Sequence, residues 1–296
     1  MAASLREGFE ALLLDLDGTL YRGAEVIAGA PAALDAGGGA QKLMFVTNNA
    51  SRSAGVVAAH LRELGFSASE SDVVTSAQAA AHVLASRLAA GSTVLIVGTD
   101  DLAAEIEQVG LQPIRRFNGV APAAVVQGHS PQTGWPDLAE AAYAVRAGAL
   151  WVAANADATL PNERGLAPGN GAMVAALRAA TDQEPVVAGK PYAPLLEDAL
   201  VRAETRDALV VGDRLDTDID GARCVGLPSL MVLTGVSTLD DLRARPADHR
   251  PTYISRTLDA LNHPVIRQES RDGGDAIDHL ADLLDENPGR AIELAR

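Results

Sequence analysis

The chain has 296 residues, 48% of them hydrophobic, which is enough for two globular domains with a sizeable core. Its net charge of −15 disfavours partners that are themselves negatively charged, so we expect neither nucleic acid nor an anionic membrane surface as a partner. A single cysteine excludes an intrachain disulfide, and neither a signal peptide nor a membrane-spanning stretch is evident, so we expect a cytoplasmic protein without membrane insertion.

Short apolar runs that end in small or polar residues recur along the chain, with helical patterns between them. Runs that are apolar throughout are typical of strands covered on both faces, and their alternation with helices predicts parallel α/β sheets. In such sheets ligands bind at the carboxyl ends of the strands. The expected strands are residues 11–15, 42–47, 93–98, 123–128, 149–155, 207–213 and 229–234, and the clearest helices are residues 53–64 and 193–203.

The first run ends in two aspartates separated by one residue, within the sequence ALLLDLDG. In an extended strand residues i and i+2 face the same side, so the carboxylates of Asp15 and Asp17 can enter one pocket, and Gly18 permits a sharp turn. Carboxylates this close repel each other unless a cation or a proton separates them. The pattern fits a metal site, an acid/base pair or a nucleophile with a proton donor, and equally a solvated turn.

Two further strand ends carry groups suited to an anion. Thr47, Asn48 and Asn49 follow the second run, and a helix is expected after Ser51, so hydroxyl, amide and helix N-terminus can all donate to an anion. The alternative is an ordinary serine cap. Lys190 lies in the sequence GKP at the rim of a sheet, where a solvated surface charge is the alternative.

The fourth strand end is the acidic sequence GDRLDTDID after the run at residues 207–213. Asp213 follows an apolar strand directly, and Asp216, Asp218 and Asp220 lie close behind. Four carboxylates so close together favour a nearby cation, and hard oxygen ligands indicate Mg²⁺. Acids that complement a helix dipole are the alternative for Asp216 and Asp218.

Together, DLDGTL, VTNN, GKP and GDRLDTD resemble the four motifs of haloacid dehalogenase superfamily phosphatases, over about residues 8–260. The resemblance implies a Rossmann-like catalytic core of residues 1–78 and 185–264, with a smaller α/β cap domain inserted at residues 79–184. The acidic tail, residues 265–296, is expected to form a loosely attached helix.

Residues 151–174 are similar to the type IIA cap segment of the subgroup that contains 4-nitrophenyl, phosphoglycolate and pyridoxal phosphatases. Among the members of this subgroup, the glycerol 3-phosphate phosphatases are the most similar, as judged by the sequences VTNNASRSA, VLIVGT, RAGALWVAAN and VVGDRLDTDI. The cap of this subgroup suggests a homodimer.

The resemblance assigns a role to each carboxylate. Asp15 would be the nucleophile that forms an aspartyl phosphate, and Asp17 would exchange protons with the leaving group and with water. Mg²⁺ would be held by Asp15, the backbone carbonyl of Asp17 and Asp213, with Asp218 and Asp216 behind them.

The resemblance also assigns the groups that would bind the substrate. Thr47, Asn48, Asn49 and Lys190 would bind the phosphoryl oxygens, and Thr47 and Lys190 would also stabilise the transition state. The candidates for contacting the leaving group are Asn155, Asp157 and Arg164, although the first two can also shape a turn and the arginine can be solvated.

The small aromatic content, 3%, and the absence of aromatic residues from 155–171 favour a small polyol phosphate over a stacked ring. Taken with the resemblance to the glycerol 3-phosphate phosphatases, this implies hydrolysis of glycerol 3-phosphate to glycerol and phosphate. The alternatives are phosphoglycolate or pyridoxal phosphate as the substrate, phosphoryl transfer to a second alcohol, and a non-enzymatic protein that binds phosphorylated metabolites.

Overall fold

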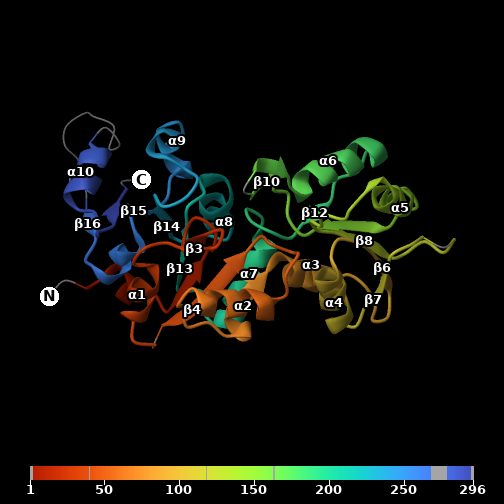
Figure 1. The fold of residues 1–296 in the computed structure, drawn as a ribbon, viewed down its shortest axis with the longest axis horizontal. Coiled ribbons are helices and arrows are strands. Elements are labelled where there is room, and N and C mark those ends of the chain that lie inside the picture. The colour runs from red at the N-terminus through yellow and green to blue at the C-terminus, as the bar shows by residue number, and fades with distance from the viewer. Residues whose placement is uncertain (1–2, 40, 118, 163, 268–278, 295–296) are drawn as a thin grey trace. The chain divides into compact units, whose positions relative to one another are not determined.

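The computed structural model describes residues 3–39, 41–117, 119–162, 164–267 and 279–294 (Figure 1). The chain forms two compact units. The first comprises Met1–Val46, Ala58–Val73 and Leu196–Arg296, and the second comprises Thr47–Val57 and Val74–Leu195. The core and cap boundaries expected from the resemblance stay a prediction.

The largest sheet has eight strands, and strands distant in sequence are neighbours in it. Its pairs β1–β13, β1–β4, β13–β14, β14–β15 and β16–β17 are parallel, and β15–β17 is antiparallel. In sheet order the strands are β16 (Ile266–Arg267), β17 (Ile292–Glu293), β15 (Tyr253–Ser255), β14 (Ser229–Val232), β13 (Ala208–Gly212), β1 (Ala11–Leu14), β4 (Lys42–Thr47) and β5 (Val73–Thr75).

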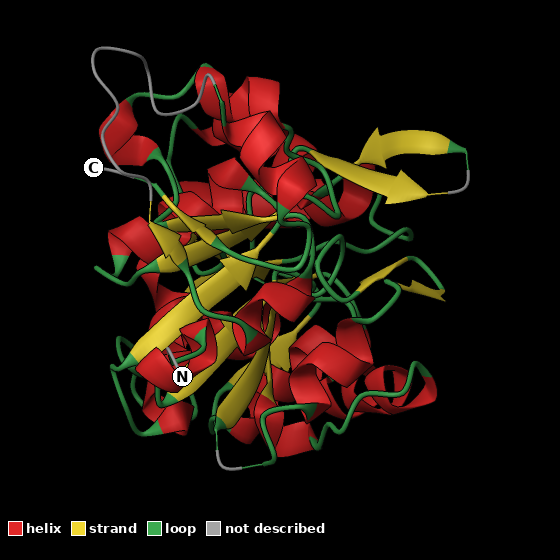
Figure 2. Ribbon diagram, turned by 90° about the vertical axis from the view of Figure 1, so that its left-hand side faces the viewer, coloured by secondary structure: helices red, strands yellow, loops and turns green. Residues whose placement is uncertain are grey.

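The central strands of this sheet are apolar along their whole length because both of their faces are covered. All four residues of β1 and all five residues of β13 are buried. Figure 2 shows helices along both faces of the strands. The helices that lie wholly or partly in the first unit are α1 (Ala30–Asp35), α2 (Ala54–Glu63), α7 (Ala193–Ala203), α8 (Asp220–Cys224), α9 (Leu239–Arg243) and α10 (Leu280–Glu286).

The second unit has its own parallel sheet of five strands. In sheet order the strands are β12 (Val186–Val187), β9 (Leu150–Ala153), β8 (Ala124–Gln127), β6 (Thr93–Val97) and β7 (Gln112–Ile114). Its further helices are α3 (Ser76–Ala85), α4 (Asp100–Gln108), α5 (Trp135–Arg146) and α6 (Asn170–Thr181). All seven strands expected from the apolar runs are present, so the prediction of parallel α/β sheets is confirmed.

Two hairpins lie outside these sheets. β2 (Tyr21–Arg22) pairs with β3 (Glu25–Val26), and β10 (Thr159–Asn162) pairs with β11 (Gly165–Pro168), both antiparallel. In the described part of the chain, no helix is both long and apolar enough to cross a membrane.

The expectation of a loosely attached tail is wrong for residues 280–294. Leu280 and Leu284 of α10 and Ile292 of β17 are completely buried, in a cluster that also contains Met231 and Ile254 of the main sheet. β17 also pairs with both β15 and β16, and α10 lies near β16 in Figure 1. The spaced leucines of the acidic helix α10 therefore form its buried face. The strand that follows them, β17, has two residues and was too short to be recognised from its sequence.

Candidate active site

Asp15 and Asp213 come from the carboxyl ends of two adjacent parallel strands. β1 pairs with β13 so that Leu14 lies opposite Val211, and the N–H of Asp15 donates to the Val211 carbonyl at 2.8 Å, which extends the ladder by one residue. Because parallel strands end at the same edge of a sheet, the register brings the two side chains together. The sequence alone placed each of them at a strand end but did not show that the strands are neighbours.

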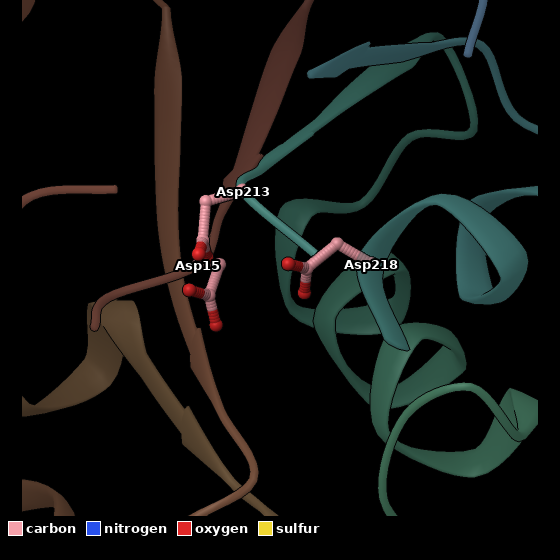
Figure 3. Close-up of side chains that lie close together, drawn as sticks. All are labelled: Asp15, Asp213 and Asp218. Carbon is pink, nitrogen blue, oxygen red and sulfur yellow. The ribbon is translucent and has the colours of Figure 1, made fainter. Parts of the chain in front are cut away.

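Asp218 completes a group of three carboxylates. One oxygen from each of Asp15, Asp213 and Asp218 lies within 4.8 Å of the other two, and in Figure 3 the side chains point toward one another. Asp213 and Asp218 are completely buried and Asp15 is half-buried. Asp218 belongs to a π-helical turn, Leu215–Ile219, and the Arg214 N–H donates to its Oδ2 at 3.1 Å. Such turns are frequent at functional sites.

Three glycines leave the space that this group occupies. A Cβ on Gly18 would lie 2.4 Å from Oδ2 of Asp213, and one on Gly235 only 1.9 Å from the same atom. A Cβ on Gly212 would lie 2.4 Å from Cβ of Asp218. Gly18 also has a φ of 86°, which a residue with a side chain rarely adopts. Backbone therefore approaches the carboxylates where any side chain would displace them.

The electrostatics of the group favour a divalent cation. Two ionised carboxylates 4.8 Å apart repel by about 3.5 kcal/mol at an effective dielectric constant of about 20, and the group contains three such pairs. A divalent cation removes this repulsion, and a set made only of oxygen ligands suits Mg²⁺ or Ca²⁺. Asp17 is exposed and its carboxylate lies outside the group, which leaves its backbone carbonyl as its candidate metal ligand.

Residues 234–237, a loop after β14, support the group and were missed in the sequence. The Val236 N–H donates to Oδ2 of Asp213 at 2.6 Å, and Oγ of Ser237 accepts from the Leu215 N–H at 3.0 Å. The Thr234 hydroxyl donates to the Gly18 carbonyl at 2.6 Å. The one signal in the sequence was that this loop follows the carboxyl end of an expected strand, but only the structure shows that this strand lies beside β13.

Asp216 points elsewhere. Its two oxygens accept from Nε and Nη2 of Arg214 at 3.1 and 2.8 Å, and it is not one of the three grouped carboxylates. Partial burial raises the pKa of this carboxyl, but the hydrogen bonds and charge of Arg214 outweigh that effect, so the pKa lies below its ordinary value. Asp216 thus forms an ion pair with Arg214, two residues before it.

The loop after β4 is largely bound within the second unit. Oγ1 of Thr47 accepts from the Asn49 N–H at 3.1 Å, and Oδ1 of Asn49 accepts from the N–H and the hydroxyl of Ser51 at 2.7 and 2.8 Å. At the start of α2, the Ser53 N–H donates to a carboxylate oxygen of Asp101 at 3.2 Å. One of the helix N-terminal donors expected to face a phosphate therefore already binds a carboxylate.

Asn48 joins three of the other predicted site residues. It forms side-chain hydrogen bonds with the Asp157 carboxylate and with the backbone of Lys190, and its carbonyl accepts from Nδ2 of Asn155. Lys190 is almost completely buried, which excludes the alternative of a solvated surface charge. Arg164 is exposed at the end of the β10–β11 hairpin.

Comparisons with known proteins agree with this arrangement. The haloacid dehalogenase-like hydrolase model matches residues 12–112, and a second model, HAD-hydrolase-like, matches residues 187–261. The D-glycerol 3-phosphate phosphatase of Mycobacterium tuberculosis is 60% identical over 260 residues, which are 88% of this chain and 72% of that protein. This chain belongs to the haloacid dehalogenase-like hydrolases. The resemblance read from the four motifs is confirmed.

Further phosphatases of known structure or sequence are similar to this chain. The crystal structure of the glycerol phosphate phosphatase of Mycobacterium tuberculosis in complex with magnesium matches with a TM-score of 0.87 and 49% identity, covering 100% of this chain and 96% of that chain. A p-nitrophenyl phosphatase from Archaeoglobus fulgidus matches with a TM-score of 0.78 and 27% identity, covering 84% and 97%. An acid sugar phosphatase of Staphylococcus aureus is 35% identical over 253 residues, or 84% of this chain and 95% of that protein.

Proposed function

We propose that this protein is a Mg²⁺-dependent phosphatase that hydrolyses glycerol 3-phosphate to glycerol and phosphate. The observation that carries the proposal is the group of Asp15, Asp213 and Asp218 at the carboxyl edge of a parallel sheet. The 60% identity to a D-glycerol 3-phosphate phosphatase supports the choice of substrate. The structure of a related phosphatase in complex with magnesium supports the choice of metal.

The proposed reaction proceeds in two steps at Asp15. A carboxylate oxygen of Asp15 attacks phosphorus and forms an aspartyl phosphate, while the bond to the glycerol oxygen breaks and Asp17 protonates the departing alkoxide. Asp17 then accepts a proton from the water that attacks the aspartyl phosphate, which releases phosphate and restores Asp15. The exposure of Asp17 suits this role, because the proton donor has to reach the leaving group.

Asp15, Asp213 and the backbone carbonyl of Asp17 are the ligands we propose for Mg²⁺, with Asp218 beside them. When bound, the metal supplies positive charge that lets the carboxylates and a phosphate dianion share one pocket and keeps Asp15 ionised. The fit rests on the all-oxygen donor set and on the glycines that leave space for Asp213.

Thr47, Asn49 and Lys190 are the groups that we propose to bind the phosphoryl oxygens. The burial of Lys190 supports this role, because a charge removed from bulk water acts more strongly on a nearby anion. For the leaving group we propose Arg164, since it is exposed, whereas Asn155 is buried and bonded to the protein.

A panel of phosphomonoesters, assayed with and without Mg²⁺, tests the proposal. We expect the highest kcat/KM for glycerol 3-phosphate, compared with phosphoglycolate, pyridoxal phosphate and 4-nitrophenyl phosphate, and loss of turnover after chelation of the metal. Asp15→Asn should abolish turnover of every ester without unfolding the protein. A higher kcat/KM for phosphoglycolate would refute the substrate, and full activity of Asp15→Asn would refute the nucleophile.

A cytoplasmic location and a homodimer are part of the same proposal. The net charge of −15 suits a protein whose substrate is a small metabolite rather than a nucleic acid. Light scattering coupled to gel filtration measures the mass in solution, and a monomeric mass at micromolar concentration would rule the homodimer out.

A further inference from the structure

The side-chain amide of Asn48 forms hydrogen bonds with other residues of the protein. Its Oδ1 accepts from the Lys190 N–H at 2.8 Å, and its Nδ2 donates to the Lys190 carbonyl at 3.1 Å. The same Nδ2 lies 3.3 and 3.2 Å from the two carboxylate oxygens of Asp157. A primary amide has two N–H groups, so one serves Lys190 and the other serves Asp157. Neither is left for a substrate.

One side chain thus binds both backbone groups of Lys190. This pairing resembles a step of a β-ladder and fixes the backbone from which the ammonium group extends. The segment also passes very close to Asn48, because a Cβ on Gly189 would lie 2.7 Å from Oδ1 of Asn48. The position of Lys190 therefore depends directly on the Asn48 amide.

Asn48 is itself held from two further sides. Its carbonyl accepts from the Ser76 hydroxyl at 2.5 Å and from Nδ2 of Asn155 at 2.7 Å. The loop that contains Asn155 is bound in turn by the start of α6, where Nδ2 of Asn170 donates to the Asn155 carbonyl at 2.7 Å and the Gly171 N–H donates to the Asp157 carbonyl at 2.8 Å. A hydrogen-bonded path thus runs from α6 to Lys190 through Asn48.

We propose that Asn48 is a positioning residue that fixes Lys190 and the Asn155–Asp157 loop in one arrangement, and that its side chain is not a substrate ligand. The effect on phosphate binding rests on the proposed function, in which Lys190 binds the phosphoryl group. The effect on the Lys190 backbone is independent of the proposed function. Asp157 then acts by anchoring the amide of Asn48 rather than by touching the leaving group.

The composition of the chain makes the test unusually direct. The protein has two lysines, Lys42 and Lys190, so selective ¹⁵N-lysine labelling gives two backbone amide signals in an NMR spectrum. The Lys190 N–H reports its bond to Asn48, and the Lys42 N–H, which donates to the Glu10 carbonyl at 3.1 Å, is an internal reference. Hydrogen exchange of the two amides needs no turnover. Titration with inorganic phosphate and Mg²⁺, followed on the Lys190 signal, gives a phosphate Kd.

In Asn48→Ala we expect the Lys190 amide to exchange at least tenfold faster while the Lys42 amide is unchanged, and the phosphate Kd to rise at least tenfold. Asn48→Asp keeps an acceptor for the Lys190 N–H, so the Lys190 amide should stay protected from exchange. It loses both donors of the Asn48 amide, so its phosphate Kd should nevertheless be higher than that of the wild type. Adding Asp157→Asn to that variant restores a donor facing residue 48 and should recover part of the affinity.

The matched control is Asn262→Ala. Asn262 is also half-buried, and its side chain bonds to the Ala33 carbonyl at 3.0 Å and to Nη1 of Arg6 at 2.9 Å. Its removal should lower thermal stability and leave the phosphate Kd unchanged. Unchanged Lys190 exchange in folded Asn48→Ala, or an equal rise in Kd in Asn262→Ala, would overturn the inference. Absence of phosphatase activity in the wild type would instead overturn the proposed function and leave the exchange result intact.

Discussion

Substituting Gly235 with alanine is a sensitive test of how the carboxylate group is held. The backbone of Gly235 does not adopt a left-handed conformation, so alanine adds no backbone strain and the effect comes from its Cβ alone. That atom would lie 1.9 Å from Oδ2 of Asp213, whereas an ordinary contact starts at 3.4 Å. The carboxylate therefore has to move by about 1.5 Å, which is a large displacement for a metal ligand.

The size of the effect follows from the bond that is lost. The Val236 N–H donates to the same oxygen at 2.6 Å, and a hydrogen bond to an ionised group contributes about 1.5 to 3 kcal/mol. A carboxylate that moves away loses this bond together with its place in the group. Since about 1.4 kcal/mol corresponds to a factor of ten, we expect Mg²⁺ affinity to fall by roughly tenfold to a hundredfold.

Isothermal titration with Mg²⁺ measures the affinity, and kcat/KM over a series of Mg²⁺ concentrations shows whether excess metal restores activity. Gly8→Ala is the matched control, because a Cβ at Gly8 would meet nothing within 4 Å. It should behave as the wild type. If Gly235→Ala binds Mg²⁺ within twofold of the wild-type affinity, the close approach of this loop does not position Asp213, and our account of the site is wrong.

Three further predictions concern the metal, the tail and pH. Mg²⁺ at a hundred times its Kd should stabilise the fold by about 2.7 kcal/mol in a thermal denaturation experiment, and an equal stabilisation of Asp213→Asn would contradict the assigned ligand. Leu284→Ala should lower the free energy of unfolding, measured in urea, by about 2 to 5 kcal/mol, because Leu284 is completely buried. Val201→Ala, at an exposed position, should change it by less than about 0.5 kcal/mol, and similar values for both variants would mean that the tail is not packed. Burial lowers the pKa of His129, so the unfolded chain binds a proton at this residue more readily than the folded chain does. The free energy of unfolding should therefore fall as the pH drops below about 6.5, until the pKa of the folded state is passed. A His129→Gln variant whose free energy of unfolding falls as steeply over this pH range would refute this contribution.

The sequence by itself determined the strands and the chemistry at their ends. An apolar run such as ALLL or ALVVG is a local pattern that reports burial on both faces, and the polar residue after it marks the carboxyl end of a strand. The rule that ligands bind at this edge of a parallel sheet was then sufficient to pick out Asp15 and Asp213, which belong to one group of carboxylates, whereas the role of Thr47 stays a prediction. Membership of the hydrolase family followed from the order and complementarity of the four motifs.

Only the tertiary structure decided which of these residues meet. Sheet order makes β1 and β13 neighbours, and it also brings β14 and its loop beside Asp213, although nothing local in Val236 indicates a hydrogen bond to a carboxylate. Asp216 and Asp218 are two residues apart in one acidic run, yet one pairs with Arg214 and the other enters the site, because the backbone turns between them.

The same limit explains the tail and Asn48. The leucines of α10 became core residues because they pack in one cluster with Ile254 of β15 and Ile292 of β17, which is a long-range arrangement. Asn48 follows a strand as a substrate ligand would, and its sequence context does not show that residues more than a hundred positions away already occupy its amide. Periodicity reports which face of an element is buried, but hydrogen bonds between distant segments are fixed only when the chain has folded.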